Sequence, residues 1–364
     1  DVVNDMPDAI SLGVGEPDFE TPMNIRTQAI YSLEQGKTFY TSNAGLPVLR
    51  QEICKYVERK YNVSYNPKNE ILITVGGSEA IDMGLRCVLD PGDEVIIPQP
   101  AYVSYEPCTI MAGGKPVIID LKAENEFRLT PEELEAAITP KTKVLILPFP
   151  NNPTGAIMEA KDLEAIIPII IKHDLIVMSD EIYAELTYTG KHVSIASYPG
   201  MKERTILING FSKAFAMTGW RLGYACGPAE IIEQMTKLHQ YAIMCAPTLS
   251  QYGAIEAVKN SDEEVENMVK QYNQRRRFLL SELERLGLDC FEPGGAFYVF
   301  PSIKKTGMTS EEFATKLLES QKLAVVPGNA FGRSGEGFIR ISYAYSIDNL
   351  KEGIRRIEEF LKNV

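Results

Sequence analysis

Short apolar runs alternate with helical patterns between about residues 71 and 226, and this alternation limits the possible folds more than any other feature of the sequence. It is typical of βα units, in which helices cover a mainly parallel sheet. The candidate strands are 71–75, 94–98, 116–120, 143–148, 175–180, 205–209 and 221–226. We therefore predict an α/β fold whose large domain has a seven-stranded, mainly parallel sheet between helices.

Two Thr-Pro pairs predict helix starts beside these strands. Thr130 precedes Pro131, and Glu133 follows three residues after the threonine, which is the pattern of a capping box with proline in the first turn. Thr21-Pro22 shows the same opening, and Gly36 predicts the end of that helix.

The pattern changes after about residue 228. A charge-rich helical stretch at about 261–287 leads to a helix near 309–320, a strand within 337–344 and a terminal helix at about 346–362. A chain of 364 residues is long enough for more than one domain. We expect a large domain of residues 26–260 and a smaller α+β domain formed by residues 1–25 and 261–364.

The charge of the chain excludes some partners. Its formal net charge is −12 at pH 7, which argues against binding to nucleic acid or to an anionic membrane. The densest basic run, 275–277, is expected to lie on a solvated helix face because acidic residues follow it. The longest apolar stretch, 165–171, is too short to span a bilayer.

Cysteine and histidine usage points away from several kinds of site. The six cysteines are scattered and form no CxxC pair, so we expect no disulfide framework or zinc site and a reducing, cytoplasmic location. The three histidines are far apart, which argues against a histidine metal site and against a Ser-His or Cys-His nucleophile.

Lys213 stands among apolar residues, with Phe211, Phe215 and Met217 close in sequence. One interpretation is a lysine whose stem crosses apolar surface while its ammonium reaches water. The other is a desolvated amine with a lowered pKa that can condense with an aldehyde. The segment alone leaves both open.

Polar residues that follow the strands deserve inspection because ligands of open α/β sheets lie beyond the carboxyl ends of strands. Gly76, Gly77 and Ser78 follow the first strand, either as a phosphate-binding turn or as an ordinary turn with Ser78 as helix cap. The turn lacks the GxGxxG pattern, which weakens a dehydrogenase interpretation. Asn152 precedes Pro153 and is either a turn residue or a donor to a ligand oxygen.

Asp180 ends a strand that should be buried, so its carboxylate needs a cation. A structural arginine or a protonated heterocyclic nitrogen would serve. Tyr183 follows three residues later, and Arg221 has the guanidinium fork that suits a phosphate. Together with Lys213, these groups describe a pyridoxal phosphate site.

The sequence resembles the class I/II aminotransferases of fold type I over nearly its whole length. The stretches that carry the resemblance are "LGVGEPDF" (12–19), "YTSNAGLPVLR" (40–50), "VGGSEA" (75–80), "PAYVSYEP" (100–107), "NNPTG" (151–155), "SDEIYAEL" (179–186), "FSKAFAMTGWRLGY" (211–224), "GGAFYVF" (294–300) and "FIRISYA" (338–344). The bacterial branch with aspartate, aromatic and acetyl-diaminopimelate aminotransferases is the most similar. Gly210 stands where many relatives have a serine.

The resemblance implies a role for each matching residue. Lys213 would carry the cofactor as a Schiff base and move the proton between the substrate Cα and the cofactor C4′, and Asp180 would keep the pyridine nitrogen protonated. The other implied cofactor contacts are Asn152 and Tyr183 at the ring oxygen, Tyr102 on the ring face, and Gly77, Ser78 and Arg221 at the phosphate.

The resemblance also implies partners. Tyr40 would reach a phosphate in the neighbouring subunit, which makes the active unit a homodimer with shared active sites. Arg340 would bind the substrate α-carboxylate in a bidentate pair, with Gly13 and Asn152 in the same pocket. The implied substrates are an L-amino acid, with aspartate or an aromatic one favoured, and a 2-oxo acid such as 2-oxoglutarate.

Other functions stay open on the motifs alone. A Cβ–S lyase on the same fold would keep the lysine and the carboxylate-binding arginine. A cofactor sensor without turnover is disfavoured because no helix-turn-helix segment is present and Lys213 is intact.

Overall fold

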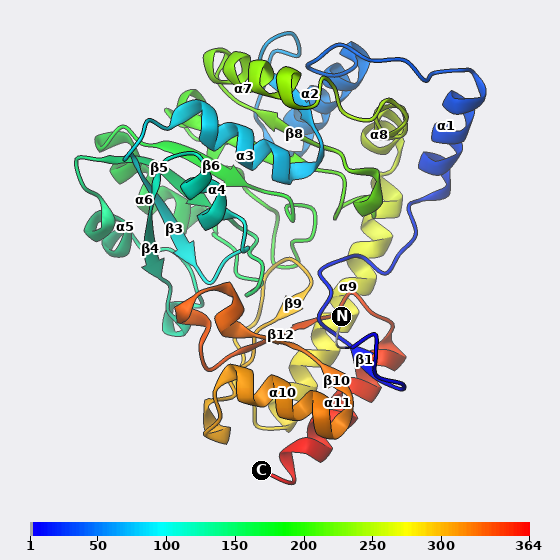
Figure 1. Cartoon of the computed structure of the whole chain (residues 1–364), viewed down its shortest axis with the longest axis vertical. Coiled ribbons are helices and arrows are strands. Elements are labelled where there is room, and N and C mark those ends of the chain that lie inside the picture. The colour runs from blue at the N-terminus through cyan, green and yellow to red at the C-terminus, as the bar shows by residue number, and fades with distance from the viewer. Residues whose placement is uncertain (1–2) are drawn as a thin grey trace.

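The larger part of the computed structural model, which describes residues 3–364, is built around a seven-stranded sheet (Figure 1). Its order is β2 (Ile71–Thr74), β8 (Gly223–Cys226), β7 (Thr205–Gly210), β6 (Ile176–Asp180), β5 (Thr142–Leu147), β3 (Glu94–Gln99) and β4 (Lys115–Asp120). Six of these strands run in the same direction, and β8 runs opposite to them. The prediction of a seven-stranded, mainly parallel sheet is confirmed.

Helices cover both faces of this sheet because its central strands are apolar on both faces. In β7, Ile206 and Ile208 pack on the side of α3 (Gly76–Val88), α4 (Tyr105–Met111) and α7 (Ala229–Ala242), while Leu207 packs on the opposite side. The opposite layer contains α2 (Pro47–Tyr61), α5 (Pro131–Ala137), α6 (Ala160–Lys172) and α8 (Thr248–Asn260). The helices of the two layers do not cover the carboxyl ends of the parallel strands. These ends face the C-terminal elements described below.

The two predicted helix starts differ in outcome. The Thr130 hydroxyl accepts from the Glu133 N–H at 3.2 Å, and the Glu133 carboxylate accepts from the Thr130 N–H at 3.1 Å, which confirms the capping box of α5. At α1 (Met23–Glu34), Pro22 is itself the N-cap, and the Thr21 hydroxyl donates to the Ala216 carbonyl instead of capping.

A smaller group of elements lies below the sheet in Figure 1, reached through the long helix α9 (Asp262–Arg285). It contains the antiparallel sheet β11 (Val326–Pro327), β12 (Ile339–Ser342) and β9 (Tyr298–Val299), with α10 (Ser310–Gln321) and α11 (Ile347–Leu361). The strand β1 (Ile10–Ser11) pairs with β10 (Leu323–Ala324), so this N-terminal segment packs with the C-terminal part of the chain. The boundaries at residues 25–26 and 260–261 stay a prediction.

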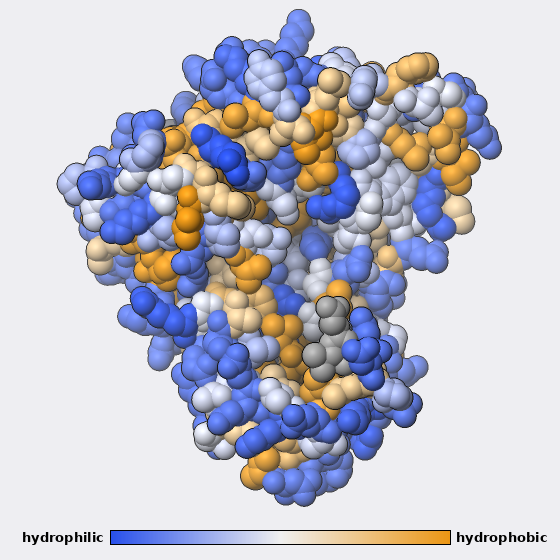
Figure 2. Space-filling model, in the orientation of Figure 1, coloured by the Kyte–Doolittle hydropathy of each residue, from blue (hydrophilic) through white to orange (hydrophobic). Residues whose placement is uncertain are grey.

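Exposed apolar side chains gather over α1, where Figure 2 shows orange side chains at the upper right. Met23, Ile30 and Leu33 are each more than half exposed.

None of the helices within residues 3–364 is both long and apolar enough to cross a membrane.

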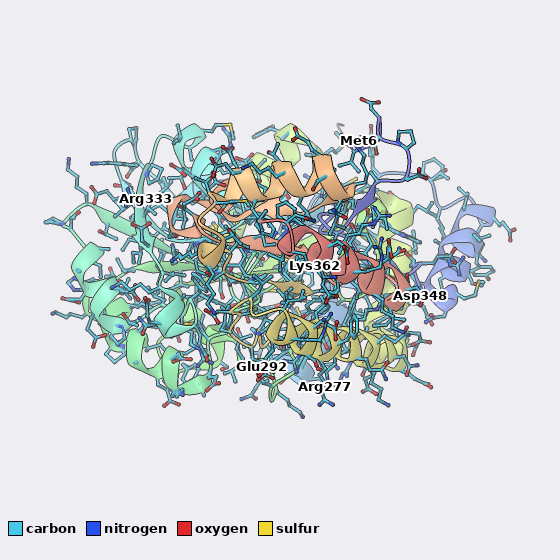
Figure 3. The ribbon with its side chains drawn as sticks, turned by 90° about the horizontal axis from the view of Figure 1, so that it is seen from below. Met6, Arg277, Glu292, Arg333, Asp348 and Lys362 are labelled. Carbon is cyan, nitrogen blue, oxygen red and sulfur yellow. The ribbon has the colours of Figure 1, made fainter. Side chains whose placement is uncertain are left out.

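The arginines of α9 correct the prediction of a solvated basic face. Arg275 is buried and forms a bidentate pair with Asp18 at 2.8 and 3.0 Å, and Arg276 is buried against Glu292. Within the run 275–277, only Arg277 is exposed, and it projects at the edge of the molecule (Figure 3). Asp18 lies 257 positions from Arg275 and Glu292 lies beyond the end of α9, so the residues that adjoin the basic run do not reveal these partners.

Candidate active site

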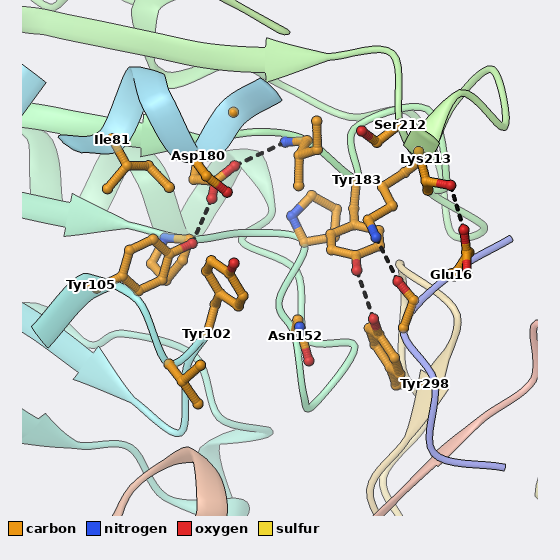
Figure 4. A pocket seen from close by; sticks show the side chains of 18 of the residues that line it. Glu16, Ile81, Tyr102, Tyr105, Asn152, Asp180, Tyr183, Ser212, Lys213 and Tyr298 are labelled. Carbon is orange, nitrogen blue, oxygen red and sulfur yellow. Dashed lines mark hydrogen bonds between the residues drawn. The ribbon is translucent and has the colours of Figure 1, made fainter. Parts of the chain in front are cut away.

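A cavity of about 460 Å³ lies between the carboxyl ends of the parallel strands and the smaller group of elements. Most of the residues expected at the site line this cavity, and only Tyr40 and Gly13 do not. The expected residues that line it are Gly77, Ser78, Tyr102, Asn152, Asp180, Tyr183, Lys213, Arg221 and Arg340. Figure 4 shows the main side chains. Residues spread over more than 260 positions of sequence therefore meet in one pocket.

Lys213 follows β7 and points into this cavity (Figure 4). Its Nζ donates to the Gly15 carbonyl at 2.5 Å and lies 5.8 Å from the ring centroids of Tyr183 and Phe297. The pKa of the amine is lowered to about 8, mainly by burial; the charge of Glu16 acts in the opposite direction, and the charge of Arg340 contributes to the lowering. The desolvated amine is thus the better of the two interpretations.

The apolar residues next to Lys213 in the sequence are not the ones that surround its amine in the structure. Phe211, Phe215 and Met217 are buried in a separate cluster beside α2 and α8. Phe297, from the strand region of the smaller group, supplies part of the apolar wall.

The depressed pKa gives a prediction for stability. Between about pH 8 and 10.5 the unfolded chain binds more protons than the folded one at Lys213, so the free energy of unfolding rises with pH there. Lys213→Met should therefore raise the free energy of unfolding of the cofactor-free protein at pH 7 by about 1 to 3 kcal/mol. Denaturant unfolding at pH 7 and pH 10 tests this, with the exposed Lys237→Met as control. A gain of equal size at both pH values would contradict the desolvation argument.

Asp180 is the last residue of β6 and is 7% exposed. Burial raises its pKa, and the Tyr105 hydroxyl, which donates to Oδ2 at 2.6 Å, counteracts this. The Ile182 N–H donates to Oδ1 at 3.2 Å. Sequence reasoning missed Tyr105, although its position three residues after Tyr102 at the start of α4 was an available signal.

The turn between β2 and α3 forms the end of the cavity suited to a phosphate. Gly76 has φ +72°, and a Cβ there would lie 2.4 Å from Arg221 Nη2, so the guanidinium packs directly on the glycine. Ser78 does not cap α3, as one interpretation had it, because the N-cap is Val75. Gly77 and Ser78 instead lie in the first turn, where backbone N–H groups lack intrahelical partners.

Arg221 also corrects a strand boundary. It has φ +51° and follows a 3₁₀ turn (Thr218–Trp220), so β8 begins at Gly223. Gly210 faces this strand closely, since a Cβ there would lie 3.1 Å from Gly223 Cα and 3.0 Å from Ile182 Cδ1. A serine at position 210 would therefore need its neighbours to shift.

Arg340 in β12 reaches the cavity from the smaller group. Its Nη1 donates to Asn152 Oδ1 at 2.7 Å and its Nη2 to the Gly13 carbonyl, so Gly13 contributes a backbone oxygen behind the pocket. The guanidinium carbon lies 4.4 Å from the ring centroid of Tyr298. Among residues 3–364, the buried Nε of Arg340 has no hydrogen-bond partner, which leaves a donor for a ligand.

Of the three tyrosines expected at the site, Tyr183 and Tyr102 line the cavity and Tyr40 does not. The Tyr183 and Tyr298 hydroxyls are hydrogen-bonded at 2.7 Å (Figure 4), and Tyr298 is a cavity residue that the sequence analysis missed. Tyr102 packs edge-to-face against Tyr105. Tyr40 is 80% exposed and lies outside the cavity, in a surface hollow with Phe39 and Thr248.

The cavity fits pyridoxal phosphate by the chemistry of its donors. It offers an amine for an aldehyde at Lys213, a carboxylate for a ring nitrogen at Asp180, and the Arg221 guanidinium beside a helix N-terminus for a phosphate. Fold and site together thus define a fold type I pyridoxal phosphate enzyme.

Comparison with known proteins gives the family. A family model for class I and II aminotransferases matches residues 7–357, and the chain belongs to this family of pyridoxal-phosphate-dependent enzymes. An aspartate aminotransferase of Pyrococcus abyssi is 49% identical, covering 100% of this chain and 94% of the relative. An aromatic-amino-acid aminotransferase of Thermococcus litoralis is 46% identical with the same coverage. The crystal structure of an aromatic aminotransferase from Pyrococcus horikoshii superposes with a TM-score of 0.96 at 47% identity, covering 98% of this chain and 97% of that one.

Proposed function

We propose that this aminotransferase moves the amino group of an L-amino acid, with aspartate or an aromatic amino acid favoured, to a 2-oxo acid such as 2-oxoglutarate. The observation that carries the proposal is that one cavity holds both the desolvated amine of Lys213 and the buried carboxylate of Asp180. The choice of donor rests on the names of similar proteins, which include aspartate and aromatic aminotransferases.

The roles at the cofactor follow from the positions of the side chains. When bound, pyridoxal phosphate supplies an aldehyde and an electron-withdrawing ring. The Lys213 amine would hold it covalently as a Schiff base, and once displaced by substrate would take a proton from the substrate Cα. Asp180 would accept a hydrogen bond from the ring nitrogen. The remaining contacts would be Asn152 and Tyr183 at the ring oxygen, Tyr102 on the ring face, and Gly77, Ser78 and Arg221 at the phosphate.

Arg340 would bind the substrate α-carboxylate, because its guanidinium faces the cavity and carries an unused donor. Lysine lacks the planar fork, so Arg340→Lys should lower kcat/KM for amino donors by about 10²- to 10³-fold. Steady-state kinetics measure this, and the cofactor absorption should stay unchanged. The exposed Arg333→Lys, on the same part of the chain, should act like wild type. Loss of the cofactor band in Arg340→Lys would show that the residue supports the cofactor instead.

A homodimer with shared active sites suits the exposed surface. Tyr40 and Phe39 are each 80% exposed, and the apolar side chains of α1 lie nearby in sequence. Covering them would remove apolar area from water, and Tyr40 of each subunit would reach the phosphate of the other. We place the enzyme in the cytoplasm, where its six free cysteines would stay reduced.

A donor and acceptor screen tests the reaction itself. Nitrogen transfer from aspartate or phenylalanine to 2-oxoglutarate is the expected result. Release of pyruvate from cystathionine without transfer would contradict the proposal and favour the Cβ–S lyase.

A further inference from the structure

Behind the turn that faces the cavity, a carboxylate and an imidazole are buried together. Glu79 of α3 is 8% exposed and His239 of α7 is fully buried. The His239 Nδ1 lies 2.7 Å from Glu79 Oε2 and 3.0 Å from Oε1. Ser78 and Ile81 of the same helix line the cavity, whereas Glu79 does not. The pair therefore supports the cavity wall from outside.

Glu79 is tied to the start of its own helix. Its Oε1 accepts from the Val75 N–H at 2.7 Å, and Val75 is the N-cap of α3 and has no capping side chain of its own. The carboxylate thus ties the N-cap residue to the first turn of the helix, which begins with Gly76, while no side chain caps the N–H groups of that turn. Beneath this turn, Gly223 of β8 leaves no room for a Cβ, since one would lie 2.7 Å from Gly77 N. The turn is fixed between Gly223 and the carboxylate.

The core does not need a histidine at position 239. Within residues 3–364, its Nε2 is buried without a hydrogen-bond partner, which costs stability that an apolar residue of similar size would not. The polar contact it does make is with Glu79. Without His239, the Glu79 carboxylate would lose one of its two hydrogen-bond partners and would be free to turn toward the N–H groups of the first turn.

We propose that Glu79 and His239 are positioning residues that hold the β2–α3 turn so that Gly77 and Ser78 can bind the phosphate of the cofactor. The inference rests on the proposed phosphate site. Its distinctive consequence is that losing the pair weakens binding of a phosphorylated ligand more than binding of the same ligand without phosphate.

Equilibrium titration of cofactor-free protein, prepared from the holoenzyme, with pyridoxal phosphate and with pyridoxal tests this directly. His239→Leu should bind pyridoxal phosphate about 10- to 100-fold more weakly and pyridoxal within about 3-fold of wild type. His239→Asn keeps a donor near the place of Nδ1 and should restore most of the affinity. His173→Leu is the matched control, since His173 pairs with Glu135 on the surface far from this turn.

Equal losses for both ligands, or no loss for either, would overturn the inference. If the leucine variant does not fold, His239→Phe replaces it, because phenylalanine keeps a planar ring and removes Nδ1. The same two affinities, for pyridoxal phosphate and for pyridoxal, are then compared with those of the wild type. The proposed function fails separately, because in that case the wild-type protein itself would not bind pyridoxal phosphate at Lys213.

Discussion

Replacing Lys213 by alanine is expected to lower the rate of amino transfer by at least about 10⁴-fold, the largest effect of any single substitution in the chain. The amine would both hold the cofactor and move the proton at the substrate Cα. The other cationic side chains of the cavity cannot replace it as the base. Arg221 and Arg340 also line the cavity, but a guanidinium stays protonated and cannot act as a base. Single-turnover kinetics with aspartate and with phenylalanine measure the loss.

The control for this variant is Lys237→Ala, which removes an exposed lysine of α7 and should leave the rate unchanged. Far-ultraviolet circular dichroism should show that both variants keep the wild-type fold. A Lys213→Ala protein within about 10-fold of the wild-type rate would place the base elsewhere in the cavity.

Asp180→Asn is expected to lower the rate by about 10²- to 10³-fold while the cofactor stays bound. The carboxylate is buried and hydrogen-bonded to Tyr105 and to the Ile182 N–H, so its geometry is fixed before any ligand arrives. An amide of the same shape removes the charge that would keep a ring nitrogen protonated. Rates of both half-reactions, together with the absorption spectrum, measure the effect.

Tyr105→Phe is the comparison that separates charge from geometry at Asp180. It removes one hydrogen bond but leaves the carboxylate, so it should cost no more than about 10-fold. Equal losses in Asp180→Asn and Tyr105→Phe would mean that the orientation of residue 180 matters more than its charge.

Much of the fold could be predicted because its signals are local. The strands are short apolar runs, and the capping box at Thr130 and Glu133 is complete within four residues. The candidate site could be assembled because the carboxyl ends of parallel strands share one edge, which brings Asp180 and Asn152 to the same cavity.

Other features depended on partners that are distant in sequence. The burial of Arg275 is stabilised by Asp18, which lies 257 positions away. Phe297 and Tyr298 lie in the stretch "GGAFYVF" that carried the resemblance, but their roles at the site depend on how the segment around β9 packs against the cavity.

Reduction of the holoenzyme with borohydride, followed by peptide mass spectrometry, tests most directly whether Lys213 holds the cofactor. The expected result is a stable phosphopyridoxyl group on the peptide that contains Lys213, absent from Lys213→Ala. A label on a different lysine, or an unlabelled Lys213 peptide from an active enzyme, would contradict the proposed site.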